Sequence, residues 1–171
     1  MSDPATDAFG LSCSRWFDAP ATLVFRAFTE PALLERWFCP SPDVGVRVVV
    51  CEPRPKGRYR FVFSFPDGRT VPVVGEYHTV IPATRLAFTW TWEPPDPWAG
   101  TETFVTVDFV ERNGGTEVHI RHERFATIEM KAPHDGGWRG TLQALEEELR
   151  RHHDGRELDP GRRGNVDDLT T

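Results

Sequence analysis

The fold of the chain is decided by the stretch Tyr59-Arg60-Phe61-Val62-Phe63-Ser64-Phe65 and by the Asp67-Gly68 pair that follows it. The aromatic residues of this stretch recur at every second position, the period at which side chains share one face of a β-strand. Asp-Gly between two such segments is a strong hairpin signal, so the strand is expected to return over Thr70 to Val80. The same spacing then recurs at Leu86, Phe88, Trp90 and Trp92. We therefore expect an antiparallel sheet with one aromatic face.

The segments around this hairpin extend the sheet and place two short helices before it. Further strands are predicted over residues 11–17, 46–50, 103–110 and 116–123, and Pro94 to Pro97 is expected to form a loop. A helix is expected to start at Ala19-Pro20, because proline fits the first turn and apolar residues follow at helical spacing. Glu30-Pro31 ends that helix and opens a second one over Ala32 to Trp37.

One long amphipathic helix is predicted near the C-terminal end. Its apolar side consists of Trp138, Leu142, Leu145 and Leu149, which recur at helical spacing. Beyond Arg151 the composition becomes polar and glycine-rich, which predicts a disordered tail over residues 152–171. A flexible start over residues 1–10 and one domain over residues 11–151 complete the chain. The order of strand, helices, meander and helix indicates an α+β fold.

Length, charge and cysteine content narrow the function. The 171 residues fit one domain, and the net charge of −6 argues against nucleic acid, which requires a basic surface. Cys13, Cys39 and Cys51 have no metal-binding spacing and indicate reduced thiols. No signal peptide and no apolar run of membrane-spanning length are recognisable. We therefore expect a cytoplasmic protein without membrane insertion.

Motifs spread along the whole chain carry a family resemblance. They are Ser14 to Pro20, Leu34 to Phe38, Glu52 to Arg58, Gly75 to Tyr77, Pro82 to Trp90, Gly115 to Glu123 and Gly137-Trp138. In this order the chain resembles the START-like (SRPBCC, helix-grip) superfamily, in the branch named after the activator of heat-shock-protein-90 ATPase. The resemblance implies a curved antiparallel sheet of about six to seven strands wrapped around the long C-terminal helix. It also implies a cavity between sheet and helix for a hydrophobic small molecule such as a lipid.

The lining of this cavity is expected to come from the aromatic rows and from the helices. The candidate ligand-binding residues are Trp37, Phe38, Phe61, Phe63, Phe65, Tyr77, Phe88, Trp90, Trp92, His122, Trp138 and Leu142. Trp37 and Phe38 are expected to close the mouth of the cavity, and Trp138 to cap the start of the long helix over it. For each aromatic residue taken singly, packing in an ordinary core is the alternative.

Three polar residues are candidates for chemistry. Val118 and Ile120 mark the inward face of the last strand, so His122 on the same face is expected to project into the cavity. Relatives carry a histidine at this place, where it could bond a ligand carbonyl or act as general acid and base. Glu76 and Tyr77 are the other candidates, and since they alternate, only one of them can face the cavity. The alternative for His122 is a ring satisfied by partners within the protein.

Three functions are consistent with these residues, and neither a metal nor a cofactor is expected. They are binding of an apolar or aromatic small molecule, an enzyme of polyketide-cyclase or hydrolase type that uses His122, and a protein-interaction module or homodimer. No dinucleotide-binding, phosphate-loop or zinc-protease motif is present.

The chain departs from the family at two places. Relatives usually carry two glycines where this chain has Pro55-Lys56-Gly57. The heat-shock co-chaperone also works with an additional N-terminal domain, whereas about ten residues precede the first predicted strand here. Contact with heat-shock protein 90 is therefore not expected.

Overall fold

One antiparallel sheet of seven strands organises residues 9–153, the part of the chain that the computed structural model describes. The strands are β1 (Leu11–Phe17), β2 (Gly45–Cys51), β3 (Arg58–Ser64), β4 (Thr70–Ile81), β5 (Arg85–Trp92), β6 (Thr103–Arg112) and β7 (Gly115–Glu123). Their order in the sheet is β1-β7-β6-β5-β4-β3-β2. From β2 to β7 each strand pairs with its neighbour along the chain, while β1 pairs with β7. The two edges of the sheet are therefore β1 and β2.

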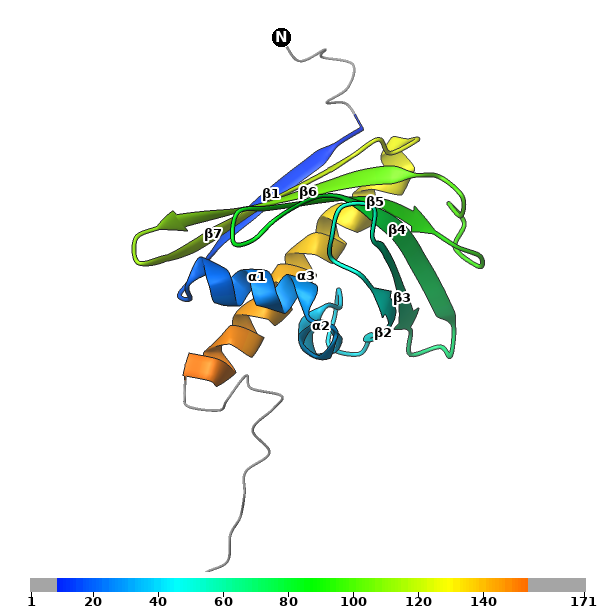
Figure 1. The fold of residues 1–171 in the computed structure, drawn as a ribbon. Coiled ribbons are helices and arrows are strands. Elements are labelled where there is room, and N and C mark those ends of the chain that lie inside the picture. Colours follow the sequence, from blue (N-terminus) through cyan, green and yellow to red (C-terminus); the bar gives the residue numbers. More distant parts are fainter. Residues whose placement is uncertain (1–8, 154–171) are drawn as a thin grey trace, which may run out of the picture.

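The helices of the described residues lie together on one side of the sheet. α1 (Ala21–Thr29) and α2 (Pro31–Trp37) connect β1 to β2, and α3 (Ile128–His153) follows β7. Figure 1 shows all three on the same side of the curved sheet, with α3 running obliquely across it. This is the α+β helix-grip arrangement expected from the sequence, so the prediction of the fold is confirmed.

The aromatic face of the sheet is its inner face. β3 buries Tyr59, Phe61 and Phe63, and β5 buries Phe88 and Trp90. The rings contact one another across the strands, for example Tyr59 and Phe88 at 5.6 Å between ring centroids in an edge-on arrangement. Such contacts add about 0.5–1.5 kcal/mol per pair to the burial of area. The strand period read from the sequence thus predicts which side of the sheet carries the core.

The predicted start of the long helix is wrong by ten residues, since α3 begins at Ile128 and Trp138 lies inside it rather than capping its start. Pro133 and two neighbouring glycines conceal the helical pattern, because proline and glycine are the weakest helix formers. At the true start, Thr127 Oγ1 accepts the N–H of Met130 at 3.2 Å, as an N-cap residue does. Met130 is fully buried, so packing outweighs local propensity here.

The segments expected to be flexible or disordered fall almost entirely outside the described residues. Residues 1–8 and 154–171 are not described. Within the described range, α3 continues to His153 and so includes the first two residues of the predicted tail.

The edge formed by β2 is covered at one point by α2. A bulge separates Val48 from Val50 in the pairing with β3. A carboxylate oxygen of Glu35, from α2, accepts the N–H of Val48 at 2.9 Å. A backbone donor on the edge strand is therefore bonded to a side chain of the same molecule.

The turn between β2 and β3 shows how the chain tolerates its departure from two glycines. Lys56 has a φ of 68°, in the left-handed region that favours glycine. Its N–H donates to the carbonyl of Tyr77 at 2.8 Å, and the carbonyl of Gly57 accepts the N–H of Tyr77 at 2.8 Å. These two bonds hold the turn on β4 with a lysine in the unfavourable conformation.

Candidate functional site

An open pocket of about 290 Å³, which we call the aromatic pocket, lies between α3 and the inner face of β3 and β5. The residues that line it are Phe38, Pro40, Phe63, Phe65, Trp90, Trp92, Asp96, Pro97, Trp98, Pro133, His134, Gly137, Trp138 and Thr141. The rings of Trp90 and Trp138 are 5.7 Å apart between centroids, so sheet and helix meet through the lining itself. The pocket is therefore formed where the sequence resemblance places the cavity of the fold.

The predicted lining residues divide into two groups of six. Phe38, Phe63, Phe65, Trp90, Trp92 and Trp138 line the aromatic pocket. Trp37, Phe61, Tyr77, Phe88, His122 and Leu142 are absent from its lining and lie in the core, with exposed fractions of 7% or less. Trp37, expected at the mouth, donates its indole N–H to the carbonyl of Ala27 at 3.0 Å and is thereby tied to α1. Only part of the aromatic face is therefore open to a ligand.

The sequence did not reveal the wall of the pocket opposite the sheet. Residues in this wall come from the loop after β5 (Asp96, Pro97, Trp98), from α3 (Pro133, His134, Gly137, Thr141) and from Pro40 after α2. A tryptophan in a proline-rich loop was the one available signal, because a large ring in a loop needs an apolar surface to cover. Pro133, His134 and Gly137 gave no such signal, since the helix was expected to begin after them.

His122 is fully buried, and both of its ring nitrogens are bonded within the protein. Trp138 donates its indole N–H to Nδ1 at 3.0 Å, so the proton of the neutral ring resides on Nε2. Nε2 donates to Thr103 Oγ1 at 2.7 Å, and Thr103 donates to the carbonyl of Trp90 at 2.8 Å. Burial, and to a smaller extent the charge of nearby His134, lower the pKa of His122 well below its usual value. His122 therefore braces Trp138 against the sheet.

A second histidine, His134, lies on the wall of the aromatic pocket and is bonded in a similar way. Its Nδ1 donates to the carbonyl of Met130 at 2.8 Å, and its Nε2 accepts the indole N–H of Trp92 at 2.8 Å. Burial is the main cause that lowers the pKa of His134 below its usual value. At neutral pH both histidines are thus uncharged, and each accepts a hydrogen bond from a tryptophan of the lining.

Glu76 and Tyr77 take opposite faces of β4, and Tyr77 is the one that faces the core. Tyr77 is buried, whereas Glu76 is half-buried on the other face. Tyr77, Phe88, Val105 and His122 are register partners on four neighbouring strands. With strands about 4.8 Å apart, Tyr77 and His122 are separated by roughly 14 Å. The three candidates for chemistry therefore do not converge on one point.

Trp90 contributes a hydrogen-bond donor that no residue within 9–153 uses. Its side chain is 5% exposed, and its indole N–H is buried without a hydrogen-bond partner. The rings of Phe38, Trp92, Trp138 and His122 surround it at centroid distances from 5.4 to 6.3 Å. Buried donors without an acceptor are uncommon in proteins, so the indole N–H of Trp90 is a donor that an acceptor group could still engage.

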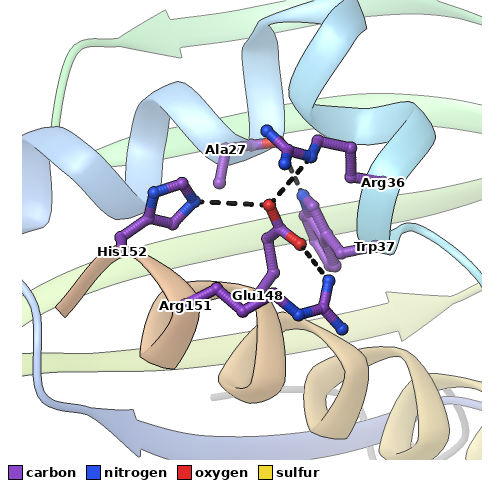
Figure 2. Close-up of polar contacts among 6 residues, drawn as sticks. All are labelled: Ala27, Arg36, Trp37, Glu148, Arg151 and His152. Carbon is purple, nitrogen blue, oxygen red and sulfur yellow. Dashed lines mark hydrogen bonds and ion pairs between the residues drawn. The ribbon is translucent and has the colours of Figure 1, made fainter. Parts of the chain in front are cut away.

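A different polar cluster joins α2 to the C-terminal half of α3, as Figure 2 shows. Glu148 is 2% exposed, and Arg36 Nε of α2 reaches its Oε1 at 3.1 Å. His152 approaches the same oxygen at 3.3 Å, and Arg151 reaches Oε2 at 2.8 Å. The arginine side chains are about half exposed, so they partly keep their hydration while the carboxylate is buried. The cluster holds two helices together.

A wider hollow of about 650 Å³ lies over β1, β6 and β7. Its lining includes Arg85, Asp108, His119 and Arg121, and Arg85 pairs with Asp108 at 2.6 Å. Charged side chains that already pair with each other leave little apolar surface for a ligand to cover. The aromatic pocket is the better candidate for this reason, although it is smaller.

The cysteines and the metal-binding side chains add no second site. Cys13, Cys39 and Cys51 are half-buried free thiols, and burial raises the pKa of each, that of Cys13 to about 11. They are therefore protonated at neutral pH and poor nucleophiles. Within residues 9–153, no three histidine, cysteine or acidic side chains are grouped so as to hold a metal ion. In the same range no helix combines the length and the apolar character needed to cross a membrane.

Comparison with known proteins gives a family match over most of the chain. The family model described as "Activator of Hsp90 ATPase homolog 1-like protein" matches residues 18–150. No curated protein matches the chain.

Solved structures with the same fold come from several bacteria. A protein from Chromobacterium violaceum aligns with a TM-score of 0.75 at 23% identity, covering 82% of this chain and 96% of that one. An AHSA1 protein from Silicibacter pomeroyi aligns with a TM-score of 0.75 at 25% identity, covering 84% and 99%. A protein from Nitrosomonas europaea aligns with a TM-score of 0.72 at 26% identity, covering 88% and 99%. The similarity extends over nearly the whole length of each of these relatives.

Proposed function

The chain belongs to the activator of Hsp90 ATPase homolog 1-like family, and from this premise we propose that it binds a small apolar or aromatic molecule in the aromatic pocket. Membership of the family establishes the fold, whereas the chemistry of the ligand depends on the residues that line the pocket. The activation of Hsp90 ATPase named in the family's description is not proposed for this chain, because the aromatic pocket gives no support for it.

The observation that carries the proposal is an open pocket lined mainly by rings. Its volume of about 290 Å³ is close to the lower end of the range for small-molecule sites, about 300–1,000 Å³. A compact molecule of one or two rings fits this volume. Burial of apolar area would supply about 25 cal/mol per Å², reduced by the cost of ordering the ligand. An oxygen acceptor on the ligand would in addition relieve the unbonded N–H of Trp90.

Binding is favoured over proton transfer because the two histidines near the pocket are already engaged. Both ring nitrogens of His122 and both of His134 take part in hydrogen bonds within the protein. A general acid or base needs a nitrogen within reach of the substrate, and here each nitrogen would first have to leave its present partner. The same bonds instead fix the orientation of Trp92 and Trp138 in the lining.

We also propose that the protein works in the cytoplasm. Its three cysteines are free thiols, and a reducing compartment keeps such thiols from pairing. Fractionation of cells followed by immunodetection would test the location, and recovery from an oxidising compartment would refute it.

The binding proposal is tested by native mass spectrometry of the full chain with a panel of neutral one- and two-ring compounds. The informative variant is Trp98→Ala, which removes a ring of the lining that is only partly buried. Its matched control is Trp16→Ala, since Trp16 is also partly exposed, at 42%, but lies outside the lining.

A complex that forms with the wild type and the Trp16→Ala variant, and that weakens about ten-fold or more in the Trp98→Ala variant, would support the proposal. Equal binding by all three proteins would place the ligand elsewhere. Absence of binding across the panel in the wild type would refute the proposal for this class of compound.

A further inference from the structure

The lining of the aromatic pocket is unusual in its charge as well as in its rings. It contains four tryptophans, Trp90, Trp92, Trp98 and Trp138, together with three phenylalanines. Asp96 is the one carboxylate among the residues that line it, and neither lysine nor arginine is among them. A set of electron-rich ring faces beside a carboxylate is the arrangement that recognises organic cations.

The charge of Asp96 is not cancelled by the histidine on the same wall. His134 Nδ1 donates to the carbonyl of Met130, and its Nε2 accepts from Trp92. A proton added at Nε2 would face the indole N–H, which is itself a donor. The ring therefore stays neutral at physiological pH and adds no positive charge beside the carboxylate.

Two hydrogen bonds to the backbone fix Asp96 within the loop after β5. A carboxylate oxygen of Asp96 accepts the N–H of Trp98 at 2.8 Å, and the N–H of Asp96 donates to the carbonyl of Glu93 at 3.2 Å. Within the described part of the chain, Asp96 is absent from the ion pairs formed by its charged neighbours. Its position is thus fixed without a cationic partner.

Two arginines close to the lining have carboxylates of their own. Arg69 lies over the outer ring Phe65 at 5.3 Å and pairs with Asp67 at 2.8 Å. Arg60 pairs with Glu93 at the base of the loop that carries Asp96. These pairs contribute little net charge at the pocket, and Asp96 remains the one carboxylate in its lining, within a chain of net charge −6.

We propose that the aromatic pocket prefers a free organic cation, a small quaternary or protonated amine attached to an apolar group. The cation would lie against the tryptophan faces near Asp96, and the apolar group would fill the remainder of the pocket. This inference rests on the proposed function, because it specifies the chemistry of the ligand in the same pocket.

The test compares two ligands of the same shape and different charge. Phenyltrimethylammonium carries the positive charge, and tert-butylbenzene replaces the charged nitrogen with carbon. Affinities of the full chain for both are measured by isothermal titration calorimetry at pH 7.5, with native mass spectrometry as a second readout. We expect the cation to bind about ten-fold more tightly than its neutral counterpart.

The informative variant is Asp96→Asn, which removes the charge and keeps an oxygen to accept the N–H of Trp98. In this variant the preference for the cation should shrink to about two-fold or less, mainly because the cation binds more weakly. The matched control is Asp18→Asn, which removes an exposed carboxylate that does not line the pocket and should preserve the preference.

The outcomes separate this inference from the proposed function. If tert-butylbenzene binds as tightly as the cation or more tightly, the preference for a cation is wrong and the apolar binding site stands. If neither ligand binds, the inference fails together with this form of the proposed function. Phosphatidylcholine vesicles should not displace phenyltrimethylammonium, and displacement would overturn the assignment to a free cation in favour of a lipid headgroup.

Discussion

The two halves of α3 are stabilised by opposite kinds of chemistry. The first half, residues 128–141, contains Pro133 and the glycines of the helix, and it supplies the helical wall of the aromatic pocket. The second half, residues 142–153, presents buried leucines to the core and the carboxylate of Glu148 to α2. Neutral histidines bond to tryptophans around the first half, whereas ion pairs surround the second.

One helix can therefore contribute to ligand binding with one segment and to the stability of the fold with another. Proline and glycine residues in the first half leave space for the aromatic pocket beside the sheet. Hydrogen bonds between histidine and tryptophan rings hold the lining of this pocket in place. The leucines of the second half are buried against the core. Substitutions in either half, or in the sheet beside it, should therefore affect binding and stability to different extents.

The largest effect is expected from Leu145→Ala in the second half. Leu145 is fully buried, and removal of its side chain should lower the free energy of unfolding by about 3 kcal/mol. Ligand affinity of the folded protein should stay within two-fold, because Leu145 does not line the pocket. Urea unfolding gives the first quantity and calorimetry the second. A loss of affinity on the scale of the loss of stability would show that the halves are coupled.

A somewhat smaller loss is expected from Gly140→Ala in the first half. A Cβ at this position would lie 2.0 Å from the carbonyl oxygen of Pro40, so the backbone after α2 must move. The free energy of unfolding should fall by roughly 2 kcal/mol. Pocket binding should weaken as well, since Pro40 and Phe38 both line the pocket. Unchanged affinity in this variant would contradict the assignment of the first half to binding.

Lowering the pH should reduce the stability of the fold through His122, which accepts a hydrogen bond from Trp138 in the first half of α3. Its pKa is lowered well below 6.5 in the folded protein and returns to about 6.5 on unfolding. The unfolded chain therefore binds a proton that the folded chain refuses, and stability is complete above pH 6.5 and falls below it. Between pH 7.5 and 5.5 the loss from this residue should approach about 1.4 kcal/mol, with a further contribution of the same sign from His134.

Urea unfolding at both pH values measures this loss, and one variant identifies its source. Relative to the wild type, His122→Gln should lose most of the His122 contribution. A dependence that survives in His122→Gln would assign the effect to other groups.

The smallest effect is a gain in stability from Gly136→Ala. No heavy atom outside the immediate chain neighbours and the local helix backbone lies within 4 Å of the place of a Cβ at this position, and the residue is exposed on α3. Alanine should therefore raise the free energy of unfolding by about 0.7 kcal/mol through its helix propensity alone. Together with Gly140→Ala, this variant separates the effect of a helical glycine from that of a close contact. A loss of stability would show that the first half needs its flexibility even away from the pocket.

The sequence predicts the fold of this chain better than its candidate site. Strand period, the Asp67-Gly68 turn and the leucine spacing of α3 are local signals, and the strands and the second half of α3 follow them. The first half of α3 was missed because Pro133 and the glycines oppose the helix locally while buried contacts favour it. The bonds of His122 to Thr103 and Trp138 connect residues far apart in the chain. No spacing in the sequence reveals such partners. The alternation of the strand therefore indicates that His122 faces inward, but not which residues its ring nitrogens bond.

The bond between Glu35 and the edge strand β2 has a consequence for the protein at high concentration. A strand from another molecule that approached this edge would need the N–H of Val48 as a donor, and would find a carboxylate in its place. The bulge beside it also shifts the spacing of the remaining donors. Cross-molecule extension of the sheet through β2 is therefore opposed both by charge and by register. At high concentration the protein should therefore not form fibres by pairing of β2 edges, and self-association would have to use another surface.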